Sequence, residues 1–315
     1  MPDLRPNISA TADTFIHYLF ASIGNEHILL SFINAVRENV GLPPLKEAHV
    51  LSPFNPKTFV MEKLSIIDIK AVAEDNHTFV IEFQVAKQSA FAKRALYYWA
   101  KTFSSQLLHG EDYETLSPVT TIVLTRFLLF GELEKLHNMF QVTAKDHPEI
   151  LFTDDLQIHT LELDVTKLGQ LPAIKKPLRQ WLEFFYYADK KSEEEMKALL
   201  ENSGDPAISQ AYDAYQRFNQ DAEMRHLEDM REMYLHDMTT EMNFARAEGE
   251  ARGEVKGEVK GAVNSILMIL EARFGNVPVA IRRDVTQITD LTILGPLTVL
   301  AAKCESLDEF SAAVK

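Results

Sequence analysis

The sequence predicts an α/β domain, with helices packed on a mixed sheet, followed by an all-helical C-terminal region. Two apolar runs joined by a polar turn predict a β-hairpin within residues 64–88. The amphipathic segment 91–109 predicts a helix, and the apolar or alternating runs 119–124 and 156–165 predict two more strands. The order strand, strand, helix, strand favours an α/β core. From residue 175 onward the pattern is helical and charged.

Length and composition exclude several classes of protein. A chain of 315 residues is long for one domain, and its 46% of hydrophobic residues is enough to build a core, which excludes disordered and fibrous classes. We predict no signal peptide, because the first residues lack a basic start followed by an apolar run. No stretch approaches the roughly 18 uncharged apolar residues of a membrane span. The single cysteine, Cys304, fits a reducing compartment, so we expect a cytoplasmic protein.

The negative charge is unevenly distributed along the chain. The net charge is −14. Residues 1–130 hold 11 Lys+Arg and 13 Asp+Glu, a net of −2, which leaves 21 and 33, a net of −12, for residues 131–315. The charge therefore weakens a nucleic-acid hypothesis without excluding it, because the N-terminal part is nearly neutral.

Three polar residues interrupt the apolar runs of the predicted hairpin. Glu82 and Gln84 are two residues apart, so their side chains share one face of a strand. Pairing of the two strands would bring Asp68 to the same place, and converging carboxylates repel unless a cation lies between them. Oxygen ligands of this kind suit Mg²⁺ or Mn²⁺. The alternative is that these carboxylates protect a sheet edge, because the motif is short enough to arise by chance.

Two further predicted helices flank this hairpin on the N-terminal side. Residues 14–20 and 27–40 have apolar residues at helical spacing. Asp13 precedes the first of them, and we favour a role as its N-cap. The alternative is that Asp13 is a third acidic group near the metal.

The helix predicted for residues 91–109 ends at Gly110. Its predicted buried stripe consists of Ala92, Leu96, Trp99, Phe103 and Leu107. The opposite face carries Arg94, Tyr98, Lys101 and Ser105. That face is either simply exposed to solvent, or it uses Arg94 and Lys101 to hold phosphates.

We expect four parts in the chain. They are a core domain (1–170), a helical extension (171–246), a helical linker (247–262) and a small helical domain (263–315). The linker is a Gly/Glu/Lys repeat with glycines every fourth residue, which indicates either a semi-flexible linker or a glycine seam between two helices, for example across a dimer. The closing domain is small for independent stability, so we expect it to pack on something, such as a second copy of itself.

No other motif of catalysis or cofactor binding stands out. The sequence has no dinucleotide fingerprint, P-loop or G-x-S-x-G elbow. Its ten histidines show no zinc spacing.

Several segments, in the same order, resemble the recombination-promoting nuclease (Rpn) family, also described as PD-(D/E)xK nuclease family transposases. The segment DTFIHYLF (13–20) is similar to the family's opening helix, with His17 in place of the usual Lys. SIIDIKA (65–71) and VIEFQ (80–84) resemble its two catalytic strands, and residues 94–113 resemble its R-x-x-Y-Y helix and the turn after it. Further similar segments are residues 27–36, 156–163 and 181–185.

This resemblance implies a restriction-endonuclease-like core and Mg²⁺-dependent (or Mn²⁺-dependent) DNA endonuclease activity. Asp68 and Glu82 would be the metal ligands, with Asp13 as a further candidate. Gln84 would complete the catalytic set, at a position where many related nucleases carry Lys. A Gln orients water by hydrogen bonds but supplies no positive charge.

The resemblance also implies DNA as the partner, in transposition or recombination. Arg94, Lys101 and Lys87 are the candidate DNA or phosphate contacts. We expect a homo-oligomer, such as a dimer, formed through the C-terminal helices. The alternative function is a catalytically weak or inactive nuclease-fold protein that serves as an interaction or oligomerisation module.

Overall fold

A computed structural model of the chain describes residues 6–52, 54, 69–85, 90–200 and 204–314. By contacts the chain divides into two compact units, residues 1–232 and 233–315. Unit 1 contains the sheet and the helices that cover it, and unit 2 is helical. The α/β core with a helical C-terminal region, predicted from the sequence, is confirmed.

The centre of unit 1 is a six-stranded mixed sheet with the order β1-β2-β3-β4-β6-β5. Its strands are β1 (Ala48–Val50), β2 (Ile69–Ala73), β3 (Thr78–Gln84), β4 (Val119–Thr125), β5 (His137–Ala144) and β6 (His147–Glu162). The predicted hairpin is present as the antiparallel pair β2 and β3. The sequence patterns did not indicate β1 or β5, and β6 begins nine residues earlier than the predicted residue 156.

The three middle strands, β3, β4 and β6, run parallel. The helix α4 (Phe91–Ser104) makes the crossover from β3 to β4. Their register aligns Glu82 with Val123 and, one strand further, with Thr160. It likewise aligns Gln84 with Thr125 and Glu162. Because laterally aligned residues of a sheet point to the same face, Glu82 and Gln84 of β3 lie on the same side as Thr160 and Glu162 of β6.

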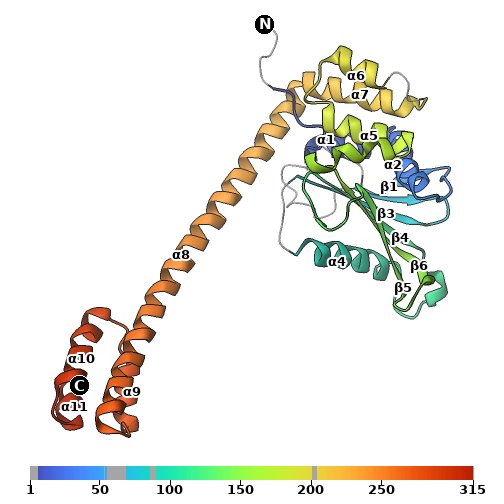
Figure 1. The fold of residues 1–315 in the computed structure, drawn as a ribbon. Helices are drawn as coiled ribbons and strands as arrows, with labels where there is room; N and C mark the ends of the chain where they lie inside the picture. The colour runs from blue at the N-terminus through green and yellow to red at the C-terminus, as the bar shows by residue number, and fades with distance from the viewer. Residues whose placement is uncertain (1–5, 53, 55–68, 86–89, 201–203, 315) are drawn as a thin grey trace. The chain divides into compact units, whose positions relative to one another are not determined.

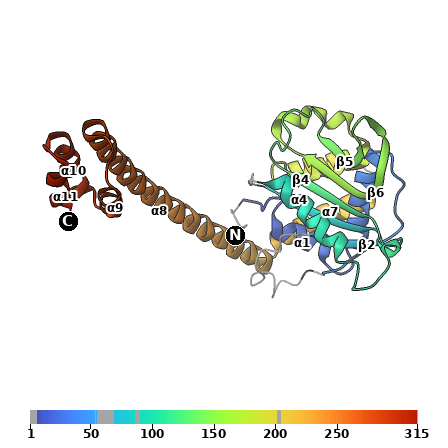
Figure 2. The ribbon, with the colours of Figure 1, turned by 90° about the horizontal axis from the view of Figure 1, so that it is seen from below.

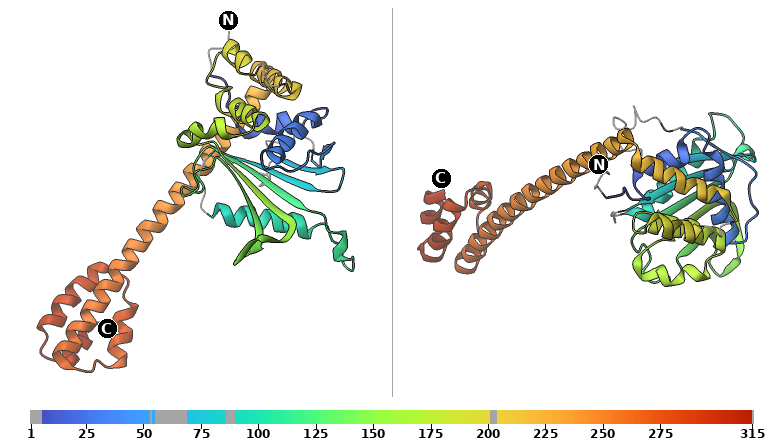
Figure 3. Two further views of the ribbon diagram at one scale, coloured as in Figure 1. Left: turned by 45° about the vertical axis from the view of Figure 1, so that its right-hand side comes forward. Right: turned by 90° about the horizontal axis from the view of Figure 1, so that it is seen from above.

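Helices cover both faces of this sheet unequally. Figure 1 shows α4 alone on one side and the other helices of unit 1 on the opposite side, and Figure 2 shows α4 lying across the sheet. The left view of Figure 3 shows the same two layers from another direction. The opposite side carries α1 (Asp13–Ala21), α2 (Glu26–Asn39), α5 (Lys176–Tyr187), α6 (Glu193–Leu200) and α7 (Pro206–Gln220).

The main hydrophobic core lies between the sheet and this larger helical layer. Aromatic rings from α1, α2, β3 and α5 pack together here, with centroids 5.0–6.3 Å apart. They belong to Phe20, Phe32, Phe83, Trp181 and Phe185. Truncating a buried aromatic of this kind typically costs about 3–5 kcal/mol of stability. This core therefore fixes β3 from behind, with Phe79, Ile81 and Phe83 facing it.

The orientation predicted for the helix after the hairpin is wrong. The buried residues of α4 are Phe91, Ala95, Tyr98 and Thr102, whereas Leu96 is 49% exposed. The helix is rotated so that the face bearing Arg94 and Tyr98 turns toward the sheet. It also ends at Ser104 and not at His109.

The long helix α8 (Ala222–Phe274) begins in unit 1 and continues in unit 2. The four glycines of the repeat lie inside it, and a Cβ at any of them would meet no atom within 4 Å. The last turns of α8 pack with α9 (Val279–Gln287), α10 (Leu291–Lys303) and α11 (Leu307–Val314) around a separate apolar cluster. Figure 3 shows these short helices gathered beside the end of α8.

No single helix in the described part of the chain is long and apolar enough to cross a membrane. The pair α1 and α2 reaches the required length and composition only jointly, with a bend of 105° between them.

Candidate active site

Glu82 is a buried carboxylate in the middle of the sheet. The alternation along β3 points Phe79, Ile81 and Phe83 into the main core, so Glu82 and Gln84 point to the α4 side. Val123, the lateral neighbour of Glu82, packs against α4 in a small apolar cluster. Glu82 is only 1% exposed. An acidic residue is rarely this buried unless it is paired or has a function.

The partner of Glu82 is Arg94, from the first turns of α4. The Nη2 atom of Arg94 lies 3.9 Å from Oε2 of Glu82. The guanidinium also lies over the ring of Phe91, 5.7 Å from its centroid, which helps to hold it at the sheet. The structure therefore brings together two of the residues singled out from the sequence.

Burial dominates the electrostatics of Glu82. Loss of solvent raises the pKa of its carboxyl group to about 7, although Arg94 acts in the opposite direction. Neither carboxylate oxygen accepts a hydrogen bond from the described residues. A buried carboxylate with both oxygens available has the donor chemistry of a Mg²⁺ or Mn²⁺ site, so these residues fit a divalent cation.

Gln84 extends the same polar surface to the end of β3. Its Oε1 atom is buried and accepts no hydrogen bond from the described part of the chain. Other buried oxygens on this face of the sheet likewise have no partner among the described residues: Oγ1 of Thr121, Oγ1 of Thr160 and Oε1 of Glu162. The face beneath α4 is therefore rich in oxygen acceptors, which is unusual for a buried surface.

Glu162 is a second buried carboxylate on this face, and sequence reasoning missed it. Its Oε2 atom accepts hydrogen bonds from Lys167 Nζ at 3.1 Å and from the backbone N–H of Leu129 at 2.9 Å. Glu162 thus links the chain segment after β4 to the end of β6, and this role is structural. Only the sheet register, which aligns Glu162 with Gln84, shows that the two share a face.

Tyr98 is another residue that the sequence pattern placed on the wrong side. It is 6% exposed and lies one helical turn beyond Arg94 on the face toward the sheet. Burial raises the pKa of its phenol; Arg94 opposes that rise and Glu82 adds to it. Tyr98 therefore belongs to the same electrostatic environment as the Arg94–Glu82 pair.

Two of the candidate residues, Asp68 and Lys87, lie outside the described residues. The described part of β2 begins immediately after Asp68, and its first residue, Ile69, pairs with Ile81, the neighbour of Glu82. No group of three metal-binding side chains converges within the described ranges. The ligand set proposed from the sequence includes Asp68, which those ranges omit.

Asp13 and Lys101 lie apart from the buried pair. Asp13 is the first residue of α1, whose N-cap is Ala12, so the N-cap role predicted for Asp13 is wrong. Its carboxylate instead binds Arg231, and Nε2 of His17 lies 3.5 Å from its Oδ1. Lys101 is exposed on α4, two turns beyond Arg94.

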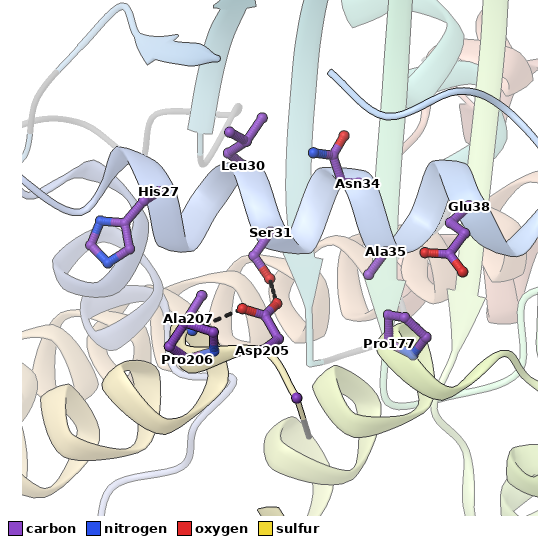
Figure 4. A pocket seen from close by; sticks show the side chains of 11 residues that line it. His27, Leu30, Ser31, Asn34, Ala35, Glu38, Pro177, Asp205, Pro206 and Ala207 are labelled. Carbon is purple, nitrogen blue, oxygen red and sulfur yellow. Dashed lines mark hydrogen bonds between the residues drawn. The ribbon is translucent and has the colours of Figure 1, made fainter. Parts of the chain in front are cut away.

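A cavity of about 510 Å³ lies on the other side of the sheet, between α2 and the start of α7 (Figure 4). Several of its polar groups hold the helices together. Trp181 Nε1 donates to Ser31 Oγ at 3.1 Å, the Ser31 hydroxyl donates to Asp205, and Asp205 caps α7 by accepting from Ala207 N at 2.9 Å. We therefore assign this cavity a structural role.

Comparisons with known proteins identify a family that covers most of the chain. The family model described as "PD-(D/E)XK nuclease family transposase" matches residues 11–245, well over half of the chain, and this range contains the whole sheet and α4. Searches of curated proteins and of solved structures found no match. The chain therefore belongs to the PD-(D/E)XK nuclease family transposases.

Proposed function

We propose that this protein is a DNA endonuclease that hydrolyses phosphodiester bonds with Mg²⁺ or Mn²⁺. Membership of the nuclease family supports the reaction class. The single observation that carries the proposal is Glu82, a carboxylate that is 1% exposed, accepts no hydrogen bond from the described residues and faces Arg94. A buried charge of this kind is costly for the fold, so its presence is best accounted for by a cation that it binds.

In this proposal Asp68 and Glu82 hold the metal ion. Antiparallel pairing of Ile69 with Ile81 supports their proximity, because each carboxylate is the chain neighbour of one of these two residues. When bound, a divalent cation supplies Lewis-acid stabilisation of a phosphate and lowers the pKa of water. Glu82 must be ionised to bind it, so its raised pKa makes binding depend on pH.

In this proposal Gln84 and Arg94 together serve the two functions of the lysine found in many related nucleases, which are to orient water and to supply positive charge. The Gln84 amide orients a water molecule by hydrogen bonds but carries no charge. Arg94 brings a permanent positive charge to the same side of the sheet, where it stabilises negative charge that develops on a phosphate. We propose that Lys101 and Lys87 contact the DNA backbone further from the reacting phosphate, and that Asp13 is not required for metal binding, since Arg231 binds it.

Plasmid nicking by the purified full-length protein tests this function. With Mg²⁺ or Mn²⁺ we expect supercoiled plasmid to be converted to the nicked form, and we expect Asp68→Ala and Glu82→Gln to abolish that conversion. Titration of Mn²⁺ by calorimetry, with heat released by the wild type and none by either variant, separates loss of metal from loss of DNA binding. Asp146→Asn, which removes an exposed carboxylate from the β5–β6 turn, is the matched control.

Two outcomes would contradict the proposal. Unchanged nicking by Asp68→Ala and Glu82→Gln would show that these residues are not the site. Absence of cleavage with either metal on supercoiled, linear and single-stranded DNA would favour the alternative, an inactive nuclease-fold protein that acts as an interaction module.

We also propose that the protein forms a homo-oligomer through its C-terminal helices. In unit 2, α8 exposes large apolar side chains, with Met242 67% and Phe244 72% exposed. The four glycines lower the intrinsic stability of this helix by roughly 1 kcal/mol each, so a partner helix is the expected source of stability. Light scattering of the full-length protein coupled to size exclusion measures the mass, and a monomer at all concentrations would refute this assembly.

A further inference from the structure

The exposed side of α4 carries a strip of basic and aromatic residues. Lys93, Tyr97 and Lys101 follow one another at intervals of four residues and are all exposed. Residues four apart on a helix are neighbours on its surface, so these three form one continuous strip. Tyr97 is 59% exposed, so its ring is accessible to a ligand.

This strip begins beside the buried pair and leads away from it. Arg94 is the chain neighbour of Lys93 and contacts Glu82. Lys101 is seven residues beyond Arg94, which returns it to within about 20° of the same direction around the helix and about 10 Å further along it. A chain that passes Arg94 therefore meets Tyr97 and Lys101 next.

The charge of α4 contrasts with that of the whole protein. Its sequence, FAKRALYYWAKTFS, has three basic residues and no acidic residue. The complete chain carries 46 acidic and 32 basic residues. A helix without acidic side chains on the surface of so acidic a protein is complementary to a polyanion.

The ring of Tyr97 is held in position by its neighbour. Its centroid lies 5.5 Å from that of Tyr98, with an interplanar angle of 67°. Tyr98 is buried against the sheet, so it supports Tyr97, whose ring remains mostly exposed. An aromatic ring fixed in this way loses little conformational entropy when a second ring stacks on it.

We propose that this strip of α4 binds a single strand of DNA next to the site of cleavage, with an unpaired base stacked on Tyr97 and phosphates held by Lys93 and Lys101. The inference rests on the proposed nuclease function and adds the form of its substrate. Exposed aromatics interleaved with basic residues bind single strands, because every unpaired base offers a face for stacking. In a duplex the bases are stacked on one another, so Tyr97 has no base face to contact.

Fluorescence anisotropy with labelled oligothymidine tests the inference. The protein is the full chain in EDTA, so that binding is measured without cleavage. We expect Tyr97→Ala to weaken binding of the single strand by about 5- to 150-fold and Tyr97→Phe to retain it. In Lys93→Ala/Lys101→Ala, the slope of log K against log salt should fall in magnitude by about 1.4, which corresponds to two lost phosphate contacts.

Controls and competing outcomes are available in the same assay. Lys197→Ala, on α6 at the opposite side of the sheet, should leave the affinity and the salt slope unchanged. An equal-length duplex that binds as tightly as the single strand, a wild type that binds no single strand, or a Tyr97→Ala variant with wild-type affinity would each overturn the inference. Because binding is read without metal, these results are independent of nicking. A protein that cleaves plasmid while Tyr97→Ala binds normally would retain the proposed function and lose this inference.

Discussion

Arg94 and Glu82 form an ion pair across the space between α4 and β3, with 3.9 Å between Nη2 and Oε2. Both residues contribute to one side of the sheet, although they are 12 positions apart in the chain. The pair places a permanent cation next to a carboxylate whose other surroundings are apolar or oxygen-rich. The pair therefore places a permanent positive charge on the face of the sheet that also carries Gln84.

Loss of Arg94 should reduce cleavage more than it reduces DNA binding. For Arg94→Ala we expect the rate of plasmid nicking at saturating DNA to fall by about 10²- to 10³-fold, the usual effect of removing one group that stabilises developing charge. Steady-state kinetics with Mg²⁺ measures this. Arg94→Ala/Gln84→Lys should recover part of the rate, because lysine restores a charge on the same face. If Arg94→Ala alone cleaves like the wild type, Arg94 has no catalytic role.

Glu82 should destabilise the metal-free protein at neutral and alkaline pH. Its folded pKa of about 7 lies above the ordinary 4.5, so the folded protein retains a proton that the unfolded chain has lost. The penalty is absent below pH 4.5, grows as the pH rises and is complete above pH 7. We therefore expect Glu82→Gln to be more stable than the wild type by about 3 kcal/mol at pH 8 and to have the same stability at pH 4.

Urea unfolding in EDTA at the two pH values gives this difference directly. Added Mn²⁺ should reverse the order at pH 8, since only the wild type gains stability from the metal. An advantage of Glu82→Gln that is the same at both pH values would mean that packing, and not charge, is responsible.

A pair of buried histidines should make the fold sensitive to acid. Nε2 of His137 and Nδ1 of His159 lie 2.9 Å apart between α2 and the sheet, and burial lowers their pKa values to about 4 and about 3. Their neutral forms are favoured in the folded state, so the stability that they contribute is present above pH 6.5 and is lost as the pH falls toward 4.

Each such histidine should add about 1.4 kcal/mol per pH unit to the slope of unfolding free energy against pH in this window. Urea unfolding between pH 5 and 7 measures the slope. We expect it to decrease in His159→Gln and to stay the same in His147→Gln, because His147 is exposed. Equal slopes in both variants would refute the assignment.

Removing one partner of the buried ion pair between Glu162 and Lys167 should destabilise the fold more than replacing both partners. The two side chains are 0% and 7% exposed. Lys167→Met leaves Glu162 buried without its cation, for which we expect a loss of about 3–5 kcal/mol in chemical denaturation. Glu162→Gln/Lys167→Met should regain most of this loss, because a glutamine oxygen still accepts from the Leu129 N–H. A double variant no more stable than Lys167→Met would contradict this account.

Most elements of the fold could be predicted from local patterns. The hairpin containing β2 and β3, the N-terminal helices and β4 all have strong apolar periodicity and clear turn residues. The strand β5 (His137–Ala144) was missed because its sequence, HNMFQVTA, mixes polar and apolar residues and is only partly buried. Its pairing with β6 creates the strand, and that partner is not visible in the local sequence.

The site was harder to predict than the fold. Glu82, Gln84 and Arg94 could be chosen from strand alternation and from the family resemblance. The orientation of α4 could not, because its apolar arc is broad and the residues that are buried, Phe91, Ala95, Tyr98 and Thr102, lie at one edge of it. The side that is buried is the one that places Arg94 against Glu82, which depends on a contact between two elements. The role of Glu162 likewise appears only through the register of β4 and β6.

The unequal covering of the two faces of the sheet has a consequence for access. Glu82 is 1% exposed and lies on the face of the sheet that α4 covers, so a movement of α4 away from the sheet would expose it. In the described chain, the apolar cluster through which α4 packs on the sheet consists of Phe91, Ala95 and Val123, with Leu129 at its edge. The helical layer on the opposite face packs through dozens of side chains. Local opening is easiest where few apolar contacts must break. Hydrogen exchange should therefore be faster for the amides of α4 than for those of α2, and α4 would be a gate that opens while the rest of the domain stays folded.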